Sequence, residues 1–119
     1  MIAHAKGRFL RVSPRKVRRV TRLLKGLPAH RAQALLEHLP KGAAKTVAKV
    51  LKSAVANATR DGSWTVEQLV ISKVLTDGGP SLKRYRAGAM GRAMPILKRM
   101  THLRIELDSQ AGGLTQSGA

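Results

Sequence analysis

The residues in this sequence that could do chemistry are mostly arginine and lysine. The 119-residue chain contains 23 lysine and arginine residues but only 6 aspartate and glutamate residues, so its formal net charge is +17. A folded domain with this charge repels itself, and a polyanion that neutralises the charge would stabilise it. Arginine binds phosphate oxygens through two parallel hydrogen bonds, which lysine cannot match. The predicted chemistry is therefore phosphate binding, with a nucleic acid as the expected partner.

Side chains for catalysis or metal binding are scarce. The absence of cysteine excludes disulfides, thiol catalysis and cysteine-ligated zinc. The four histidines do not have the spacing of metal ligands; they are His4, His30, His38 and His102. Six carboxylates offer no persuasive acid and base pair, and residues 88–91 lack the lysine of a phosphate-cradling loop. We therefore expect no enzyme, no cofactor, no metal site and no small-molecule substrate.

Aromatic residues are also few, and they are scattered along the chain as Phe9, Trp64 and Tyr85. Proteins that bind single-stranded nucleic acid usually stack bases on several exposed rings. The composition instead favours phosphate contacts and recognition of the shape of a folded RNA or a duplex.

The basic segment of residues 81–99 predicts a projecting hairpin. It follows the structure-breaking sequence Asp77-Gly78-Gly79-Pro80, has basic flanks and a middle of small residues, and contains no acidic residue. The strict alternation of apolar and polar residues in 102–108 predicts a half-buried strand that returns from the hairpin. We expect the hairpin at about residues 78–103, with RNA as its partner because it cannot neutralise its own charge. Pro95 cannot donate a ladder hydrogen bond, so we expect an irregular descending arm there.

The order of the predicted elements is strand, three helices, strand, hairpin and strand. The strands cover residues 2–12, 66–76 and 103–107, and the helices cover residues 14–25, 28–39 and 42–59. We predict an α+β fold in which a small antiparallel sheet packs against three helices and a long β-hairpin projects. Residues 1–108 are expected to form one domain. Residues 109–119 are rich in Gly, Ser and Gln and are expected to form a disordered tail.

The first predicted helix carries basic residues around most of its circumference. Ser13 suits the N-cap and Pro14 the first helical position. The apolar face consists of Val17, Val20 and Leu24, with Leu23 beside it, and the remaining positions are Arg15, Lys16, Arg18, Arg19, Arg22 and Lys25. No acidic residue precedes Glu37, so nothing nearby in the sequence pairs with these charges. This pattern favours a binding surface over a merely solvated one.

Targeting signals are not evident. No apolar run approaches the roughly 18–20 residues that a membrane span needs. The first residues also lack the apolar stretch of a secretory signal. We expect a soluble, cytoplasmic protein.

Four blocks of the sequence resemble a known family in the family's order. Ser13-Pro14-Arg15-Lys16-Val17-Arg18 is similar to the start of its first helix, and residues 47–58 are similar to its long third helix. Residues 79–84 resemble the ascending hairpin arm, and residues 91–105 resemble the tip and the descending arm, through Gly91-Arg92-Ala93, Ile96, Lys98-Arg99 and His102-Leu103-Arg104-Ile105. Across roughly residues 8–108 the chain thus resembles the L-twenty-two family of large-subunit ribosomal proteins.

The resemblance implies an α+β domain at the surface of the large ribosomal subunit, with the hairpin threaded inward through ribosomal RNA. It implies a structural protein that supports subunit assembly and whose hairpin lines the nascent-polypeptide exit tunnel. The implied partners are large-subunit ribosomal RNA, neighbouring ribosomal proteins and the nascent polypeptide. The implied tunnel-tip residues are Gly88, Ala89, Met90 and Gly91. At this tip Ala87-Gly88-Ala89 stands where the family usually has Pro-Arg-Ala.

Motif matching assigns RNA contacts to the first helix and to the hairpin. The matched residues are Arg15, Lys16, Arg18, Lys83, Arg84, Arg92, Lys98, Arg99 and His102. Neighbouring basic and capping residues complete the predicted RNA-binding set, namely Arg8, Arg11, Ser13, Arg19, Arg22 and Arg86.

Two other functions stay open on the sequence alone. A small basic protein that compacts or regulates DNA would have the same charge and size, but the sequence shows neither a heptad dimer seam nor a recognition helix with base-reading residues. A membrane-active cationic protein is disfavoured because Trp and Phe, which insert at the membrane interface, are nearly absent.

Overall fold

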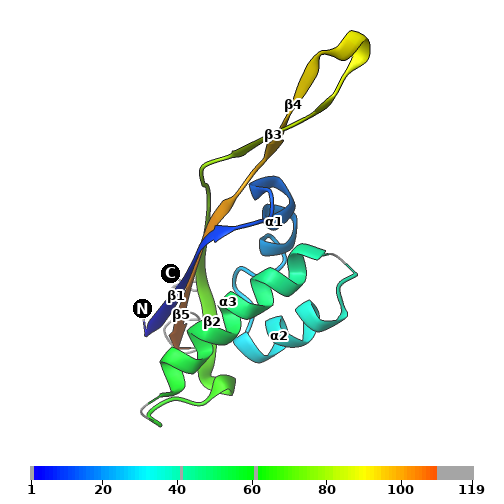
Figure 1. Ribbon diagram of the computed structural model, residues 1–119. Coiled ribbons are helices and arrows are strands. Elements are labelled where there is room, and N and C mark those ends of the chain that lie inside the picture. The colour runs from blue at the N-terminus through cyan, green and yellow to red at the C-terminus, as the bar shows by residue number, and fades with distance from the viewer. Residues whose placement is uncertain (1, 41, 61, 110–119) are drawn as a thin grey trace.

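In the computed structural model, which describes residues 2–40, 42–60 and 62–109 without the side chains of residues 84, 89 and 94–97, three helices cover one face of a three-stranded antiparallel sheet (Figure 1). A two-stranded hairpin projects from one end. The elements are β1 (Ala3–Leu10), α1 (Pro14–Thr21), α2 (Ala29–His38), α3 (Gly42–Thr59), the 3-10 turn η1 (Val66–Gln68), β2 (Leu69–Gly78), β3 (Leu82–Ala87), the turn η2 (Ala89–Gly91), β4 (Ala93–Lys98) and β5 (Thr101–Ser109). The predicted α+β fold is confirmed.

The last strand, β5, lies in the middle of the sheet, in the order β1-β5-β2. The buried residues Thr101, Leu103, Ile105 and Leu107 alternate along β5 with partly exposed ones. Since successive strand residues point to opposite faces, the buried set faces the helices and His102 and Arg104 face away from them. The sequence pattern of residues 102–108 predicted this alternation correctly.

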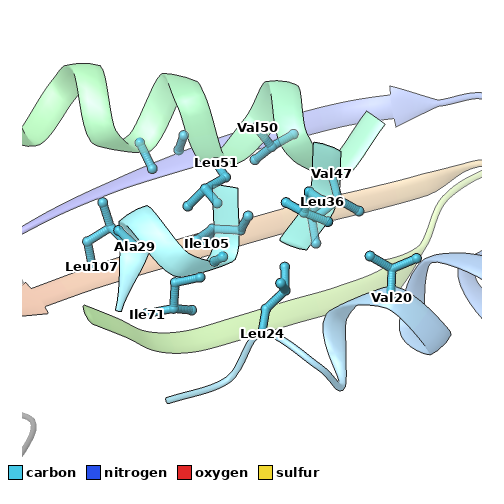
Figure 2. Packing of buried hydrophobic residues seen from close by; sticks show 14 of the residues in the cluster. Val20, Leu24, Ala29, Leu36, Val47, Val50, Leu51, Ile71, Ile105 and Leu107 are labelled. Atoms are coloured by element: carbon cyan, nitrogen blue, oxygen red, sulfur yellow. The ribbon is translucent and has the colours of Figure 1, made fainter. Parts of the chain in front are cut away.

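The helices place a continuous apolar core against that face of the sheet. Figure 2 shows Leu51 of α3 above Ile105 of β5, with Leu24 and Val20 entering from the α1 side. The apolar residues of α3 that recur every three or four positions are largely buried, and Gly42–Thr59 matches the predicted bounds. Leu23, adjoining the apolar face of α1, is 46% exposed.

Helix α1 ends four residues earlier than predicted. Ser13 caps it as expected, because the Lys16 N–H donates to the Ser13 Oγ at 3.4 Å. The chain then turns, and the Gly26 N–H donates to the Ile71 carbonyl at 2.9 Å while the Ile71 N–H donates to the Leu27 carbonyl at 3.0 Å. These two bonds to β2 replace the last helical turn, and the positive φ of Gly26 (83°) permits the change of direction.

Strand β2 departs at two places from the regular strand predicted for residues 66–76. Its expected first residues form the 3-10 turn η1, and Ser72 is an extra residue between Ile71, which pairs with Leu107, and Lys73, which pairs with Glu106. A bulge of this kind reverses which residues face the core. Leu69 and Ile71 are therefore buried, whereas beyond the bulge it is Val74 that packs against the core.

The hairpin is regular through Pro95, contrary to our expectation. The strands pair without a register shift from Leu82 with Lys98 to Ala87 with Ala93. The Gly88 N–H donates to the Arg92 carbonyl, so those residues form a hydrogen-bonded pair. Pairs alternate along an antiparallel ladder, which makes the pair of Tyr85 and Pro95 a non-hydrogen-bonded one. Pro95 therefore removes no hydrogen bond between β3 and β4.

The molecule measures 62 × 27 × 26 Å along its principal axes, and the hairpin extends its long dimension (Figure 1). Ser109, the first residue of the predicted tail, belongs to β5. The rest of that prediction, residues 110–119, lies outside the described residues.

Gly7 of β1 lets α3 approach the sheet. A Cβ atom at this position would lie 2.8 Å from Val50 Cγ2 and 3.0 Å from Leu10 Cδ1. We predict that Gly7→Ala lowers the free energy of unfolding by about 1–3 kcal/mol, as overpacking of a core does. Urea denaturation of the free protein measures this change. Gly42→Ala, where no atom lies within 4 Å, is the matched control and should cause no decrease; equal decreases in both variants would contradict the packing argument.

Candidate nucleic-acid interface

A hollow of about 770 Å³ lies between the base of the hairpin and the body. Its charged lining is exclusively basic: Arg11, Lys16, Lys98 and Arg99. The remaining lining residues are Val12, Ser13, Gly42, Ala43, Leu82 and Met100. Four cations around one hollow of this size, without a carboxylate, favour an anionic ligand.

Two helices begin at this hollow. Ser13 is the N-cap of α1, and Gly42 and Ala43 are the first residues of α3. Neither helix has an acidic residue in its first turn. Helix N-termini carry unpaired N–H groups and the positive end of the helix dipole, so they add to the attraction for phosphate.

Two smaller hollows continue from it along α1. One, of about 500 Å³, is lined by Ser13, Pro14, Arg15, Arg18, Gly78 and Arg99. The other, of about 470 Å³, is lined by Arg18, Thr21, Arg22, Lys25, Val74, Leu75, Thr76 and Asp77. Shared residues connect the three, because Ser13 and Arg99 line the first two and Arg18 lines the last two. We call these three hollows together the basic groove.

The basic groove brings together about half of the predicted RNA-binding residues. It contains Arg11, Ser13, Arg15, Lys16, Arg18, Arg22, Lys98 and Arg99. Arg19 is exposed on α1 but lines none of these hollows. Lys25 was expected on the basic surface of the first helix but not in the RNA-binding set, and the start of α3 was not expected as part of this surface. The acid-free first turn of α3 was a signal that could have found the latter.

Two of these residues also have structural roles. Arg18 Nη2 donates to the Thr76 carbonyl at 3.2 Å and so ties α1 to β2. Ser13 Oγ accepts the capping bond from Lys16. Substituting either residue would therefore disturb the body as well as the basic groove.

The other predicted residues of the hairpin lie apart from the groove. Lys83, Arg86 and Arg92 are exposed on the hairpin, which runs away from the helices (Figure 1). The side chain of Arg84 lies outside the described part of the structure. At the tip, Met90 and Gly91 both have positive φ angles, 60° and 75°, and the Met90 side chain is 97% exposed. Gly91 thus serves the turn, as its type predicted.

Arg8 and His102 occupy the face of the sheet that the helices leave open. His102 Nδ1 accepts a hydrogen bond from the Phe9 N–H at 3.1 Å. This bond requires an unprotonated Nδ1, so the imidazole proton of the neutral ring is on Nε2. Gly79 leaves room for the ring, because a Cβ there would lie 3.2 Å from His102 Nε2.

Within the described residues, no three His, Asp or Glu side chains gather closely enough to hold a metal ion. None of the helices in that part of the chain has the length and apolar character to span a membrane.

The basic groove includes two helix N-termini, and an exposed basic hairpin projects beyond it. These two features define the class of protein that binds a polyanion through both a globular body and an extended arm. The family model described as Ribosomal protein L22p/L17e matches residues 5–108. The chain belongs to this family, as the four sequence blocks predicted. It is a structural protein of the large ribosomal subunit that binds ribosomal RNA.

The groove predicts a specific salt dependence of RNA binding. Removal of one phosphate-binding side chain should reduce the slope of log K against log salt concentration by about 0.7–0.9. We expect this reduction for Arg11→Gln and for Arg99→Gln, measured with large-subunit ribosomal RNA over a salt titration. Lys49→Gln on the outer face of α3 removes the same charge away from the groove. An equal change of slope in that control would show that net charge, and not the groove, determines binding.

Proposed function

We propose that the chain supports assembly of the large subunit through the basic groove, while the hairpin passes through ribosomal RNA to the wall of the nascent-polypeptide exit tunnel. The proposed RNA contacts are the predicted basic residues of α1 and the hairpin. Residues 1–108 act in this role as one domain, and the role is structural and not catalytic. The location proposed is the ribosome of the cytoplasm.

The main support for the tunnel proposal is that the hairpin projects away from the body. Each of its strands has six residues, which extends it by about 20 Å at the usual rise of a strand. The basic side chains of Arg86, Arg92 and Lys98 are exposed, and the hairpin runs away from the helices of the body (Figure 1). A two-stranded ribbon is marginally stable by itself in water, so RNA that surrounds it would stabilise it.

The small residues around the tip fit a passage for a peptide. Ala87, Gly88 and Gly91 offer little side-chain volume, and Met90 is the largest side chain that the tip exposes. Methionine is flexible and polarisable, so it contacts varied apolar side chains without a fixed geometry. This property suits a wall along which different peptide sequences move.

Sedimentation of the assembled subunit tests the role of the groove. We expect the triple variant Lys16→Gln, Lys98→Gln, Arg99→Gln to leave the large-subunit fraction in a high-salt sucrose gradient that retains the unsubstituted chain. The reason is that counterion release makes phosphate contacts weaken steeply with salt. The matched control, Lys45→Gln, Lys49→Gln, Lys52→Gln, removes three exposed charges from α3 and should stay with the subunit. Dissociation of both variants at the same salt concentration would contradict the proposal.

Cross-linking tests the tunnel wall. A photoreactive amino acid in place of Met90 should cross-link to a stalled nascent polypeptide, because this side chain is the most exposed point of the tip. The same amino acid in place of Arg31, which is exposed on α2, should not. Cross-links from position 90 to ribosomal RNA alone would place the tip inside RNA and overturn the tunnel-wall role.

A further inference from the structure

A further pocket of about 440 Å³ lies on the face of the sheet that the helices leave open, and it shares Leu75 and Asp77 with the third hollow of the basic groove. It spans the three strands at the ends nearest the hairpin and is lined by Phe9 and Arg8 of β1, Leu75 and Asp77 of β2, and His102 of β5, among others. We call it the sheet-face pocket. Its volume lies within the range of pockets that bind small molecules, roughly 300–1,000 Å³. Neither the family nor the basic groove assigns it a ligand.

Phe9 is held in this pocket in a conformation that phenylalanine rarely adopts. Its φ is 55°, at a bulge between Gly7 and Leu10 where the register of β1 shifts. The Phe9 N–H donates to His102 Nδ1, and the two rings meet edge to face with centroids 4.9 Å apart and an interplanar angle of 85°. The Phe9 side chain is nevertheless 56% exposed. The structure thus fixes the orientation of an aromatic ring without burying it, which is what a stacking platform requires.

The two rings are far apart in the sequence, since Phe9 and His102 are separated by 93 positions. The scattering of aromatic residues along the chain therefore does not exclude a base-stacking site here. Nothing in the sequence signals the bulge that brings them together.

Asp77 provides the carboxylate of the pocket. It pairs with His102 across β2 and β5, its side chain is exposed, and among the described residues it has no ion pair or hydrogen-bond partner. A carboxylate repels phosphate, so in contact with RNA it accepts hydrogen bonds from N–H groups of a base. Guanine is the base whose Watson–Crick side presents two adjacent donors, N1–H and N2–H, which match the two oxygens of one carboxylate.

Basic residues flank the pocket. Lys6 and Arg8 line it from β1, and both are exposed. Exposed cations beside a pocket can bind the phosphates on either side of an inserted nucleotide. Cations around an aromatic ring favour RNA over a protein partner as the occupant.

We propose that the sheet-face pocket holds one unstacked guanine of the ribosomal RNA, with its ring against Phe9 and its N1–H and N2–H groups donating to Asp77. Lys6 and Arg8 contact the neighbouring phosphates. The proposal rests on the RNA-binding function of the chain and names the part of the RNA that this face recognises.

Chemical probing of the reconstituted complex tests it. The full chain is bound to large-subunit ribosomal RNA, and kethoxal, which reacts with N1 and N2 of unpaired guanines, maps the exposed ones. We expect one guanine protected by the unsubstituted chain to become reactive with both Phe9→Leu and Asp77→Asn, with RNA affinity about tenfold lower in each. Leucine at position 9 keeps the apolar contact and the strained backbone but removes the stacking ring.

The controls separate the pocket from general effects. Glu67→Gln removes an exposed carboxylate in η1, outside the pocket. This variant should protect the same guanines from kethoxal as the unsubstituted chain does. Exchange of the identified guanine for adenine gives a sharper control. Asparagine presents one donor and one acceptor, which match N1 and N6 of adenine, so the Asp77→Asn variant should bind the adenine RNA better than the unsubstituted chain does.

Each other outcome overturns the proposal. If the unsubstituted chain binds the RNA but no guanine changes reactivity in either variant, the pocket holds no guanine while the proposed function stands. If, in the assembled large subunit, a photoreactive group at position 9 cross-links to a ribosomal protein, the pocket is a protein interface. If the unsubstituted chain fails to bind the RNA, both the proposed function and the pocket proposal are wrong. Measuring RNA binding by the unsubstituted chain therefore distinguishes failure of the proposed function from failure of the pocket proposal alone.

Discussion

The central position of β5 is the constraint on which the rest of the structure depends. β1 and β2 do not pair with each other, and each is hydrogen-bonded to β5. The body of the sheet therefore closes only when the chain has passed through the hairpin and returned. Leu103, Ile105 and Leu107 of this strand are fully or almost fully buried, so the same strand completes both the hydrogen-bonded ladder and the apolar core. Arm and body form one continuous ribbon, because β2 leads into the arm and β5 leads out of it.

This arrangement also separates the charges. Basic side chains line the groove along α1 and the exposed hairpin, whereas Glu106 and Asp108 of β5 face the open side of the sheet. Asp77 of β2 lies at the edge between the two, because it lines both the groove and the sheet-face pocket. On the open side the Arg104 guanidinium lies 3.3 Å from the Glu106 carboxylate. The face opposite the helices therefore carries charges of both signs, because Lys6, Arg8 and Arg104 lie there as well. A phosphate backbone is attracted to the groove side, and contacts with more discriminating chemistry become possible on the sheet side.

The sequence predicted most of what depends on local patterns. The bounds of α3, the capping residues of α1 and the alternation in β5 each depend on neighbouring residues, and the structure matches them. The predictions that failed depended on distant partners: α1 stops early because Gly26 and Leu27 bond to β2, and the alternation of β2 reverses at the bulge at Ser72. For the groove, the sequence predicted most of the basic residues that line it. Its shape was not predicted, because the start of α3 and the hairpin base meet only in the folded chain.

The place of Pro95 in the hairpin has a consequence for the protein before it reaches RNA. A two-stranded ribbon has two free sides, and each presents backbone groups that another copy of the chain could pair with. At Pro95 the row of N–H donors on the outer side of β4 is interrupted, because the non-hydrogen-bonded position points its nitrogen away from β3. Basic side chains on both strands repel a second ribbon as well. Both features hinder strand pairing between the hairpins of two newly made copies. They thus protect the protein against this route of aggregation until ribosomal RNA covers the hairpin.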